Sequence, residues 1–264
     1  MRAFAVLSAA LLIGITVLDG CAPRAALTQN DLDNVSAAPR PGAKAPLNLR
    51  FTDQRGEPLT FGQAVSNRPT VLVFADYTCR YLCGPALVLT AAALDKTPLK
   101  PDRDYSFVVV GINPRDGPGK ARAMQASELR SSGAGAAARL LSNGPTPVAA
   151  AALGYRYLYD ARLDQYAHDT SIYILGADGS VRRLLPEFAL TPAALTSALE
   201  QARNPPSVAP PLSAPLRFIC YCLQPLVGAY DQPAVLALRL GGVATLGILG
   251  FGVFALRRRR ERRP

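Results

Sequence analysis

Two short runs of residues limit the fold of this chain more than any other feature. Residues 70–75 read Thr-Val-Leu-Val-Phe-Ala, and residues 106–112 form a second run that is almost as apolar. Strands without alternation between polar and apolar residues are typical of sheets that are buried on both faces by helices. We therefore expect an α/β domain with an internal sheet.

The segments around these two runs alternate between strand and helix patterns. Hairpin patterns occupy residues 47–61 and 170–185, and helical patterns occupy residues 86–94, 120–129 and 191–202. The order is βαβ followed by ββα, built around a strand, a cysteine and a helix start. This order predicts a thioredoxin-like fold.

The N-terminus has the pattern of an export signal. A charged start is followed by an apolar run over residues 3–18 and by the small-residue zone of residues 19–22. We therefore assign residues 1–22 to a signal peptide. Two alternatives stay open: lipidation of Cys21, since residues 18–21 are similar to a lipoprotein processing site, and an uncleaved N-terminal anchor.

The C-terminus has the pattern of a membrane anchor. Residues 234–256 are apolar apart from Arg239, and a tail over residues 257–264 begins with four arginines. Such a segment predicts a transmembrane helix with its basic tail in the cytoplasm. We expect a protein of the bacterial inner membrane with a single C-terminal span. The globular domain would then face the periplasm, an oxidising compartment.

Two Pro-rich segments separate these ends from the domain. Residues 23–46 are rich in Ala and Pro, and we expect them to be a mobile linker. Residues 204–233 form a juxtamembrane segment whose first part, residues 204–215, favours an extended polyproline conformation. The remaining residues, 47–203, have the length of one domain with its own core.

The net charge supports this topology and argues against nucleic acid as a partner. The formal charge of +10 comes from 29 basic and 19 acidic residues, and residues 257–263, with six Arg and one Glu, supply +5 of it. The remaining charge is spread along the chain without a basic patch interleaved with aromatic residues. We therefore expect no binding to nucleic acid.

Three residues carry ligand chemistry. Cys79 and Cys83 follow the first apolar run, and His168 is the only histidine of the chain. Thiolates favour Cu(I), and imidazole also suits copper, so two thiolates and one imidazole could form a trigonal site. A thiol in the first turn of a helix is also favoured as thiolate. Simpler interpretations are a redox disulfide between the cysteines, and a histidine that is solvated or has its hydrogen bonds satisfied within the protein.

Three blocks of the sequence form a recognisable pattern: VLVFADYTCRYLC at 71–83, VVVGINPRDGP at 108–118 and GYRYLYDARLDQYAHDTSIYILGADGSV at 154–181. Together they resemble the Sco/SenC family, thioredoxin-like proteins that deliver copper to cytochrome c oxidase. The resemblance implies that copper is bound by Cys79, Cys83 and His168. The block FICYC at 218–222, followed by an apolar terminal segment, is similar to a bacterial subgroup with a C-terminal membrane anchor.

The chain departs from the family pattern at a few positions. Family members usually have Pro after the first motif cysteine and often after the second, where this chain has Arg80 and Gly84. The Asp-Pro element of the family appears as Asn113-Pro114-Arg115-Asp116, so an amide replaces one carboxylate. These changes remove no ligand, and they concern the redox potential and the partner surface more than metal binding. The cis-proline of thioredoxins also has no counterpart after His168, which argues against general disulfide exchange.

Two functions are consistent with these residues. The first is a membrane-anchored copper metallochaperone with cytochrome c oxidase subunit II, or another copper protein, as its partner. The second is a thiol-disulfide oxidoreductase in which Cys79 and Cys83 form the redox-active pair. His168 favours the first function, because disulfide exchange needs no imidazole ligand. A peroxiredoxin-like peroxidase fits less well, since its reactive cysteine is usually isolated.

Some further residues allow two interpretations each. Cys220 and Cys222 either form a second thiol pair that relays Cu(I) or electrons, or pack as small apolar residues, which we favour. The alternating Tyr155, Tyr157 and Tyr159 predict one buried face of a strand. As for the carboxylates, Asp76 and Asp169 either orient the site residues or are solvated.

Overall fold

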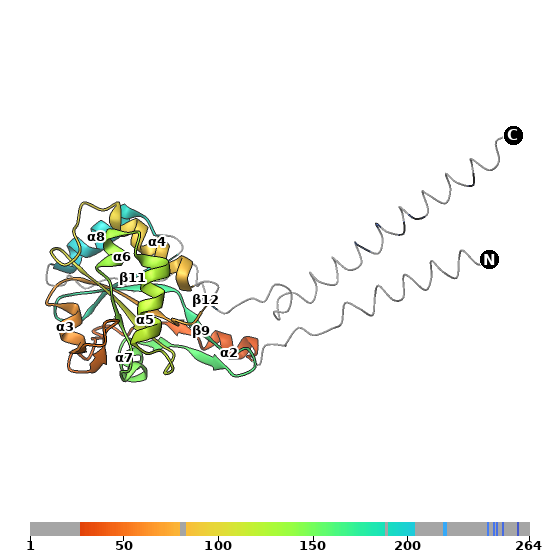
Figure 1. Ribbon diagram of the computed structural model, residues 1–264, viewed down its shortest axis with the longest axis horizontal. Coiled ribbons are helices and arrows are strands. Elements are labelled where there is room, and N and C mark those ends of the chain that lie inside the picture. The colour runs from red at the N-terminus through yellow and green to blue at the C-terminus, as the bar shows by residue number, and fades with distance from the viewer. Residues whose placement is uncertain are drawn as a thin grey trace. The chain divides into compact units, whose positions relative to one another are not determined.

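The computed structural model describes residues 27–79, 83–187, 190–203 and 219–220, and the isolated positions 242, 245, 247, 250 and 258 (Figure 1). Residues 29–222 belong to one compact unit. The predicted signal peptide lies outside the described residues, as does nearly all of the predicted C-terminal anchor and tail. Within the described part of the chain, no helix has both the length and the apolar character needed to cross a membrane.

A five-stranded sheet with the order β11-β10-β4-β5-β6 lies at the centre of this unit. Strands β4, β5 and β6 run parallel to one another, whereas β10 is antiparallel to both β4 and β11. The bounds are β4 Thr70–Ala75, β5 Ser106–Gly111, β6 Arg139–Leu141, β10 Ser171–Leu175 and β11 Val181–Pro186. All residues of β4 and β5 are buried, as their apolar runs predict.

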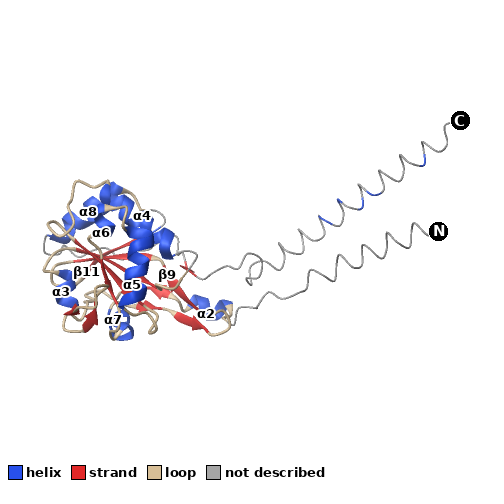
Figure 2. Ribbon diagram, viewed as in Figure 1, coloured by secondary structure: helices blue, strands red, loops and turns tan. Residues whose placement is uncertain are grey.

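Helices cover both faces of this sheet (Figure 2). Along β4, Val71 and Val73 face a core formed with α4, α6 and α8, whereas Leu72 and Phe74 face a core formed with α3 and α7. This division follows from the alternation of side chains along a strand. The helices are α3 Phe61–Val65, α4 Cys83–Asp95, α5 Pro118–Met124, α6 Gly133–Ala136, α7 Thr146–Ala152 and α8 Pro192–Arg203.

Most elements that the sequence predicts are present, with shifted ends. The first hairpin consists of β2 Arg50–Thr52 and β3 Pro58–Thr60. The helix expected over 86–94 already begins at Cys83. The helix expected over 120–129 is split into α5 and a π-helical turn, Gln125–Leu129.

The segment before the first hairpin differs from the linker that the sequence predicts. Helix α2 covers Gln29–Asp33, and β1, Ser36–Ala37, pairs antiparallel with β7, Tyr155–Arg156. The side chains of Val35 and Ala45 are buried. From Gln29 onward the chain therefore packs on the domain, because a few well-spaced apolar residues anchor it although the segment shows no periodic pattern.

A smaller sheet with the order β12-β9-β8 carries the histidine. Its strands are β8 Leu158–Asp160, β9 Gln165–Asp169 and β12 Ile219–Cys220. The alternating tyrosines do not form one strand, because β7 ends before Tyr157 and β8 begins after it. Tyr155 is buried, but Tyr159 is 43% exposed, so the prediction of a single buried face is wrong.

Candidate metal centre

The two motif cysteines lie where β4 ends and α4 begins. After β4 the chain makes a turn in which the backbone N–H of Cys79 donates to the carbonyl oxygen of Asp76, at 3.1 Å. Cys83 is the first residue of α4 and is only 3% exposed, whereas Cys79 is half-buried. Neither of them forms a disulfide. The two sulfurs thus differ in their access to solvent.

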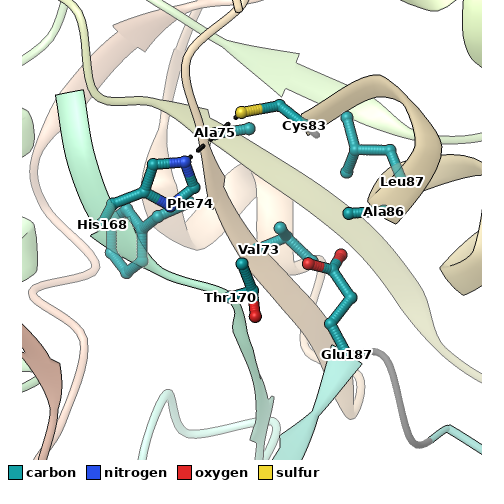
Figure 3. A pocket seen from close by; sticks show the side chains of 9 residues that line it. All are labelled: Val73, Phe74, Ala75, Cys83, Ala86, Leu87, His168, Thr170 and Glu187. Atoms are coloured by element: carbon teal, nitrogen blue, oxygen red, sulfur yellow. Dashed lines mark hydrogen bonds between the residues drawn. The ribbon is translucent and has the colours of Figure 1, made fainter. Parts of the chain in front are cut away.

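His168 reaches this helix start from a strand more than eighty residues away. It lies near the end of β9, and β10 follows almost at once and pairs antiparallel with β4. This pairing brings the start of β10 toward the carboxyl end of β4, where the cysteines follow. The Nε2 atom of His168 lies 3.3 Å from Sγ of Cys83 (Figure 3).

Tyr155 determines which nitrogen of the imidazole faces the sulfur. Its hydroxyl donates to the carbonyl oxygen of Asp169 at 2.7 Å and lies 3.0 Å from Nδ1 of His168. The carbonyl oxygen of Asp169 also lies 3.0 Å from Nδ1, and since it can only accept, Nδ1 carries the hydrogen and donates to these two oxygens. Nε2 is then the unprotonated nitrogen, and it is the one that points to Cys83. A hydrogen bond that fixes the tautomer in this way is common for metal-binding histidines.

Burial keeps this imidazole neutral. The side chain of His168 is 3% exposed, and desolvation lowers its pKa below the usual value. Weaker effects in the opposite direction come from the backbone of Asp169 and from the charges of Cys79 and Asp76. Neutral imidazole is the form that binds metal ions.

Cys79 lies near this pair without completing a three-ligand cluster. Its charge affects the pKa of His168, and its side chain packs against the larger core. Within the described ranges, however, no three His, Cys, Asp or Glu residues lie close enough together to hold one ion. The structure thus brings two of the three predicted ligands into contact and places the third nearby.

A small pocket beside the Cys83–His168 contact contains a buried carboxyl group. Glu187 lines it together with these two residues and Thr170 (Figure 3). Glu187 is 3% exposed, and burial raises its pKa to about 8. The hydroxyl of Thr90 lies 3.0 Å from both Glu187 Oε1 and the carbonyl oxygen of Ala86. The single hydroxyl hydrogen of Thr90 can be donated to either oxygen, and a protonated Glu187 can in turn donate to the hydroxyl oxygen.

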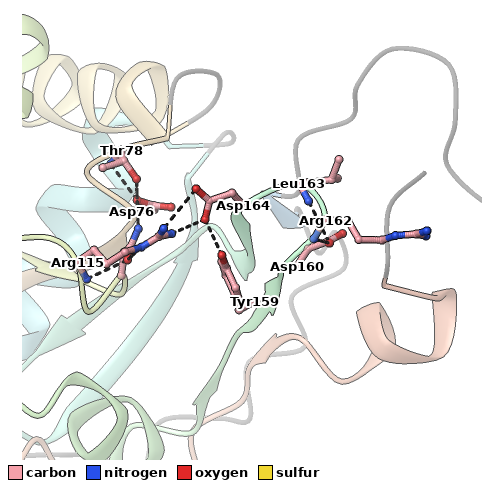
Figure 4. A network of polar contacts seen from close by, with 9 residues as sticks. Asp76, Thr78, Arg115, Tyr159, Asp160, Arg162, Leu163 and Asp164 are labelled. Atoms are coloured by element: carbon pink, nitrogen blue, oxygen red, sulfur yellow. Dashed lines mark hydrogen bonds and ion pairs between the residues drawn. The ribbon is translucent and has the colours of Figure 1, made fainter. Parts of the chain in front are cut away.

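The loop before Cys79 is held by side chains from the segment after β5 (Figure 4). Oδ1 of Asp76 accepts from the backbone N–H and the hydroxyl of Thr78, at 2.9 and 2.6 Å, and lies 3.4 Å from Nδ2 of Asn113. Asp116 accepts from the backbone N–H of Tyr77 at 2.9 Å. Burial raises the pKa of Asp116 to about 7. The Asn-Pro-Arg-Asp element therefore supports the loop that presents the first cysteine.

The same element contacts the strands that carry the histidine. Arg115 forms an ion pair with Asp164 in the connection between β8 and β9, and its guanidinium lies 5.7 Å from the ring centre of Tyr159 (Figure 4). The hydroxyl of Tyr159 also donates to Asp164. Arg115 thus joins the loop beside Cys79 to the hairpin that holds His168.

Two of the open interpretations can now be decided. Asp76 and Asp169 are each 3% exposed and hydrogen-bonded, so neither is a solvated surface residue.

The sequence analysis does not identify two residues of the site. Tyr155 was placed in the core, which is correct, but its hydroxyl also orients His168. Glu187 has no sequence signal, because the pattern of β11 does not show that a carboxyl group is buried after it.

Comparisons with known proteins agree with this fold. Two solved structures from Aquifex aeolicus VF5, a candidate electron transfer protein and a candidate electron transport protein, align with TM-scores of 0.54 and 0.51 at 15% and 14% identity. The alignments cover 62% of this chain and 95% and 99% of the other chains. They confirm the predicted α/β thioredoxin-like fold.

Other comparisons concern the family. ScoI of Arabidopsis thaliana, crystallised with copper bound, aligns with a TM-score of 0.47 at 16% identity, over 63% of this chain and 98% of that one. A search of curated proteins finds no significant match. The family model SCO1/SenC matches residues 39–204, which include the two motif cysteines and His168. Because this match covers well over half of its length, the chain belongs to the SCO1/SenC family.

Proposed function

We propose that this protein is a copper chaperone, anchored in the bacterial inner membrane, that binds copper with Cys79, Cys83 and His168 in the periplasm. The recipient would be the copper site of cytochrome c oxidase, on subunit II, or another copper protein. The observation that carries this proposal is the contact between Sγ of Cys83 and Nε2 of a neutral, buried His168, with Cys79 nearby. Membership of the SCO1/SenC family supports it.

The donor set suits copper as a cargo. Thiolates and a neutral imidazole favour Cu(I), and the imidazole also suits Cu(II). Binding requires loss of the thiol protons, so it depends on pH and on the reduced state of the cysteines. The unequal exposure of the two cysteines suits transfer, because a recipient can reach the half-buried Cys79 before Cys83.

Replacing His168 by Ala tests this assignment. We expect the reduced variant to bind copper more weakly and with a changed absorption spectrum, because one of three ligands is lost while both thiolates remain. Anaerobic titration with Cu(I) and with Cu(II) measures both effects. In the same titrations, oxidation of Cys79 and Cys83 to a disulfide should release the metal, since a disulfide sulfur is a poor ligand. Titrations of His168→Ala that coincide with wild type for both ions would show that the assignment is wrong.

A second prediction concerns the proposed anchor. A tether confines the domain to a thin layer above the bilayer and raises its effective concentration toward other membrane proteins. We therefore expect that deletion of residues 234–264 leaves copper binding unchanged but lowers oxidase activity in cells at normal expression. A reporter fused after Pro264 should be active only in the cytoplasm. Full oxidase activity from the unanchored protein at matched abundance would contradict the proposal.

The alternative function is that of a thiol-disulfide oxidoreductase acting on the cysteines of such a recipient. The observation that favours it is the pairing of a half-buried Cys79 with a buried Cys83 at a helix start. Reduction of a recipient disulfide by copper-free protein distinguishes the two functions. If His168→Ala retains that activity in full and wild type binds no copper, the oxidoreductase is the correct assignment.

A further inference from the structure

The chain beyond the family domain returns to the strand that carries the histidine. The family match ends at residue 204, and α8 ends at Arg203. The short strand β12, Ile219–Cys220, lies outside this match and pairs antiparallel with β9. Figure 1 shows the labels of β12 and β9 on neighbouring strands. Backbone pairing therefore places an extension of the domain beside the candidate metal centre.

The register of this pairing places a cysteine at the histidine. Cys220 is directly opposite His168, and Ile219 is opposite Asp169. Residues that are directly opposite in an antiparallel pair lie on the same face of the sheet, with Cβ atoms about 4.5–5.5 Å apart. Such a spacing suits two ligands of one ion, since metal–sulfur and metal–nitrogen bonds of about 2.0–2.3 Å are typical of zinc sites with Cys and His ligands.

We propose that Cys220 supplies a further thiolate to the metal centre of Cys79, Cys83 and His168. This inference rests on the copper-binding function proposed above and names an additional ligand for it. The directly contacting pair provides one sulfur and one nitrogen, and Cu(I) favours sulfur ligands. When the bond forms, the Cys220 thiol loses its proton to solvent, and the oxidation state of copper does not change.

Metal binding explains the register better than disulfide exchange does. Exchange requires a thiolate that attacks one sulfur of an existing disulfide. In the backbone register, however, the partner of Cys220 is His168, which is not a thiol. The interpretation favoured from the sequence, that Cys220 packs as a small apolar residue, predicts that its replacement does not affect metal binding. An experiment can therefore distinguish this interpretation from a role as metal ligand.

The test uses the full chain in detergent, reduced and loaded with one equivalent of Cu(I). X-ray absorption at the copper edge counts the sulfur ligands, and competition with a Cu(I) chelator measures affinity. For Cys220→Ser we expect one sulfur ligand fewer than in wild type and weaker Cu(I) binding. Cys222→Ser is the matched control, because it removes the other cysteine of the same FICYC motif. It should behave as wild type.

Two outcomes separate this inference from the proposed function. If Cys79→Ser and Cys83→Ser lose copper while Cys220→Ser keeps the wild-type sulfur count and affinity, the role of Cys220 is refuted and the proposed function stands. The inference is also refuted if Cys222→Ser alone removes a sulfur. If neither Cys79→Ser nor Cys83→Ser affects copper binding, the proposed function fails and this inference fails with it.

A crosslink tests the placement without metal. In a chain with Cys79→Ser, Cys83→Ser and Cys222→Ser, the added change His168→Cys should allow a disulfide with Cys220 under mild oxidation, because opposite positions match disulfide geometry. Mass spectrometry of the digested protein detects it. Asp169→Cys in the same background is the control, since residue 169 is opposite Ile219. Equal yields at positions 168 and 169, or no crosslink at 168, would overturn the placement.

Discussion

Replacement of Cys83 by Ser is expected to abolish tight copper binding. Of the three proposed ligands, Cys83 is the one that the fold holds most firmly, because it begins α4, is almost completely buried and contacts His168 directly. Changes in residues that only orient metal ligands typically cost roughly 10- to 100-fold in affinity, so loss of this sulfur should cost more. Competition with a Cu(I) chelator under anaerobic conditions measures the change.

The control for this variant is Cys222→Ser, which removes a cysteine outside the matched family domain. It should keep the wild-type affinity. Circular dichroism checks that Cys83→Ser is folded, which we expect because serine is slightly smaller than cysteine. A folded Cys83→Ser protein that competes for Cu(I) as well as wild type would exclude Cys83 as a ligand.

Replacement of Glu187 by Gln is expected to change how stability depends on pH. Burial raises the pKa of Glu187 from its ordinary value of 4.5 to about 8 in the folded state. Between these values the unfolded chain loses a proton that the folded protein keeps, so the free energy of unfolding of wild type falls as pH rises. Each unit of pKa difference corresponds to about 1.4 kcal/mol, and the total loss by pH 8 is on the order of a few kcal/mol.

Glutamine removes this part of the pH dependence, because it keeps a neutral group that can donate to Thr90. At pH 8 the variant should therefore be more stable than wild type, and near pH 5 the difference should be small. Asp116, with a pKa of about 7, also makes the free energy of unfolding fall as pH rises, and it does so equally in wild type and in Glu187→Gln. Urea unfolding at several pH values gives the two curves. Glu200→Gln, on the exposed side of α8, is the control. If the free energy of unfolding depends on pH in the same way for Glu187→Gln and wild type, the raised pKa of Glu187 is wrong.

The sequence predicts the centre of this fold better than its edges. The runs at 70–75 and 106–112 are uninterrupted and apolar, so they predict buried strands. The structure has a buried strand at each of these places. The helix expected over 120–129 is split, because local propensity cannot show where packing inserts a π-helical turn. The segment from Gln29 was taken for a linker because Val35 and Ala45 are too few to give a periodic pattern.

The sequence identifies the candidate residues of the site, but it does not show which of them are in contact. Residue chemistry identifies Cys79, Cys83 and His168, and the order of strands makes their approach reasonable. The contact between Cys83 and His168 depends on the pairing of β10 with β4, which no local pattern encodes. The burial of Glu187 likewise results from tertiary packing, since a carboxyl group at the end of a strand is usually solvated.

The position of β4 between β5 and β10 has a consequence for the time at which the metal centre can form. The pairing of β4 with β10 joins residues about one hundred positions apart, whereas the pairing of β4 with β5 joins residues 36 positions apart. Contacts of such long sequence separation tend to form slowly. Both motif thiols therefore emerge during synthesis well before β9 brings the imidazole to them. During that interval the thiols are accessible to oxidants, and the time needed to close the sheet determines how long they must remain reduced before the proposed copper site can form.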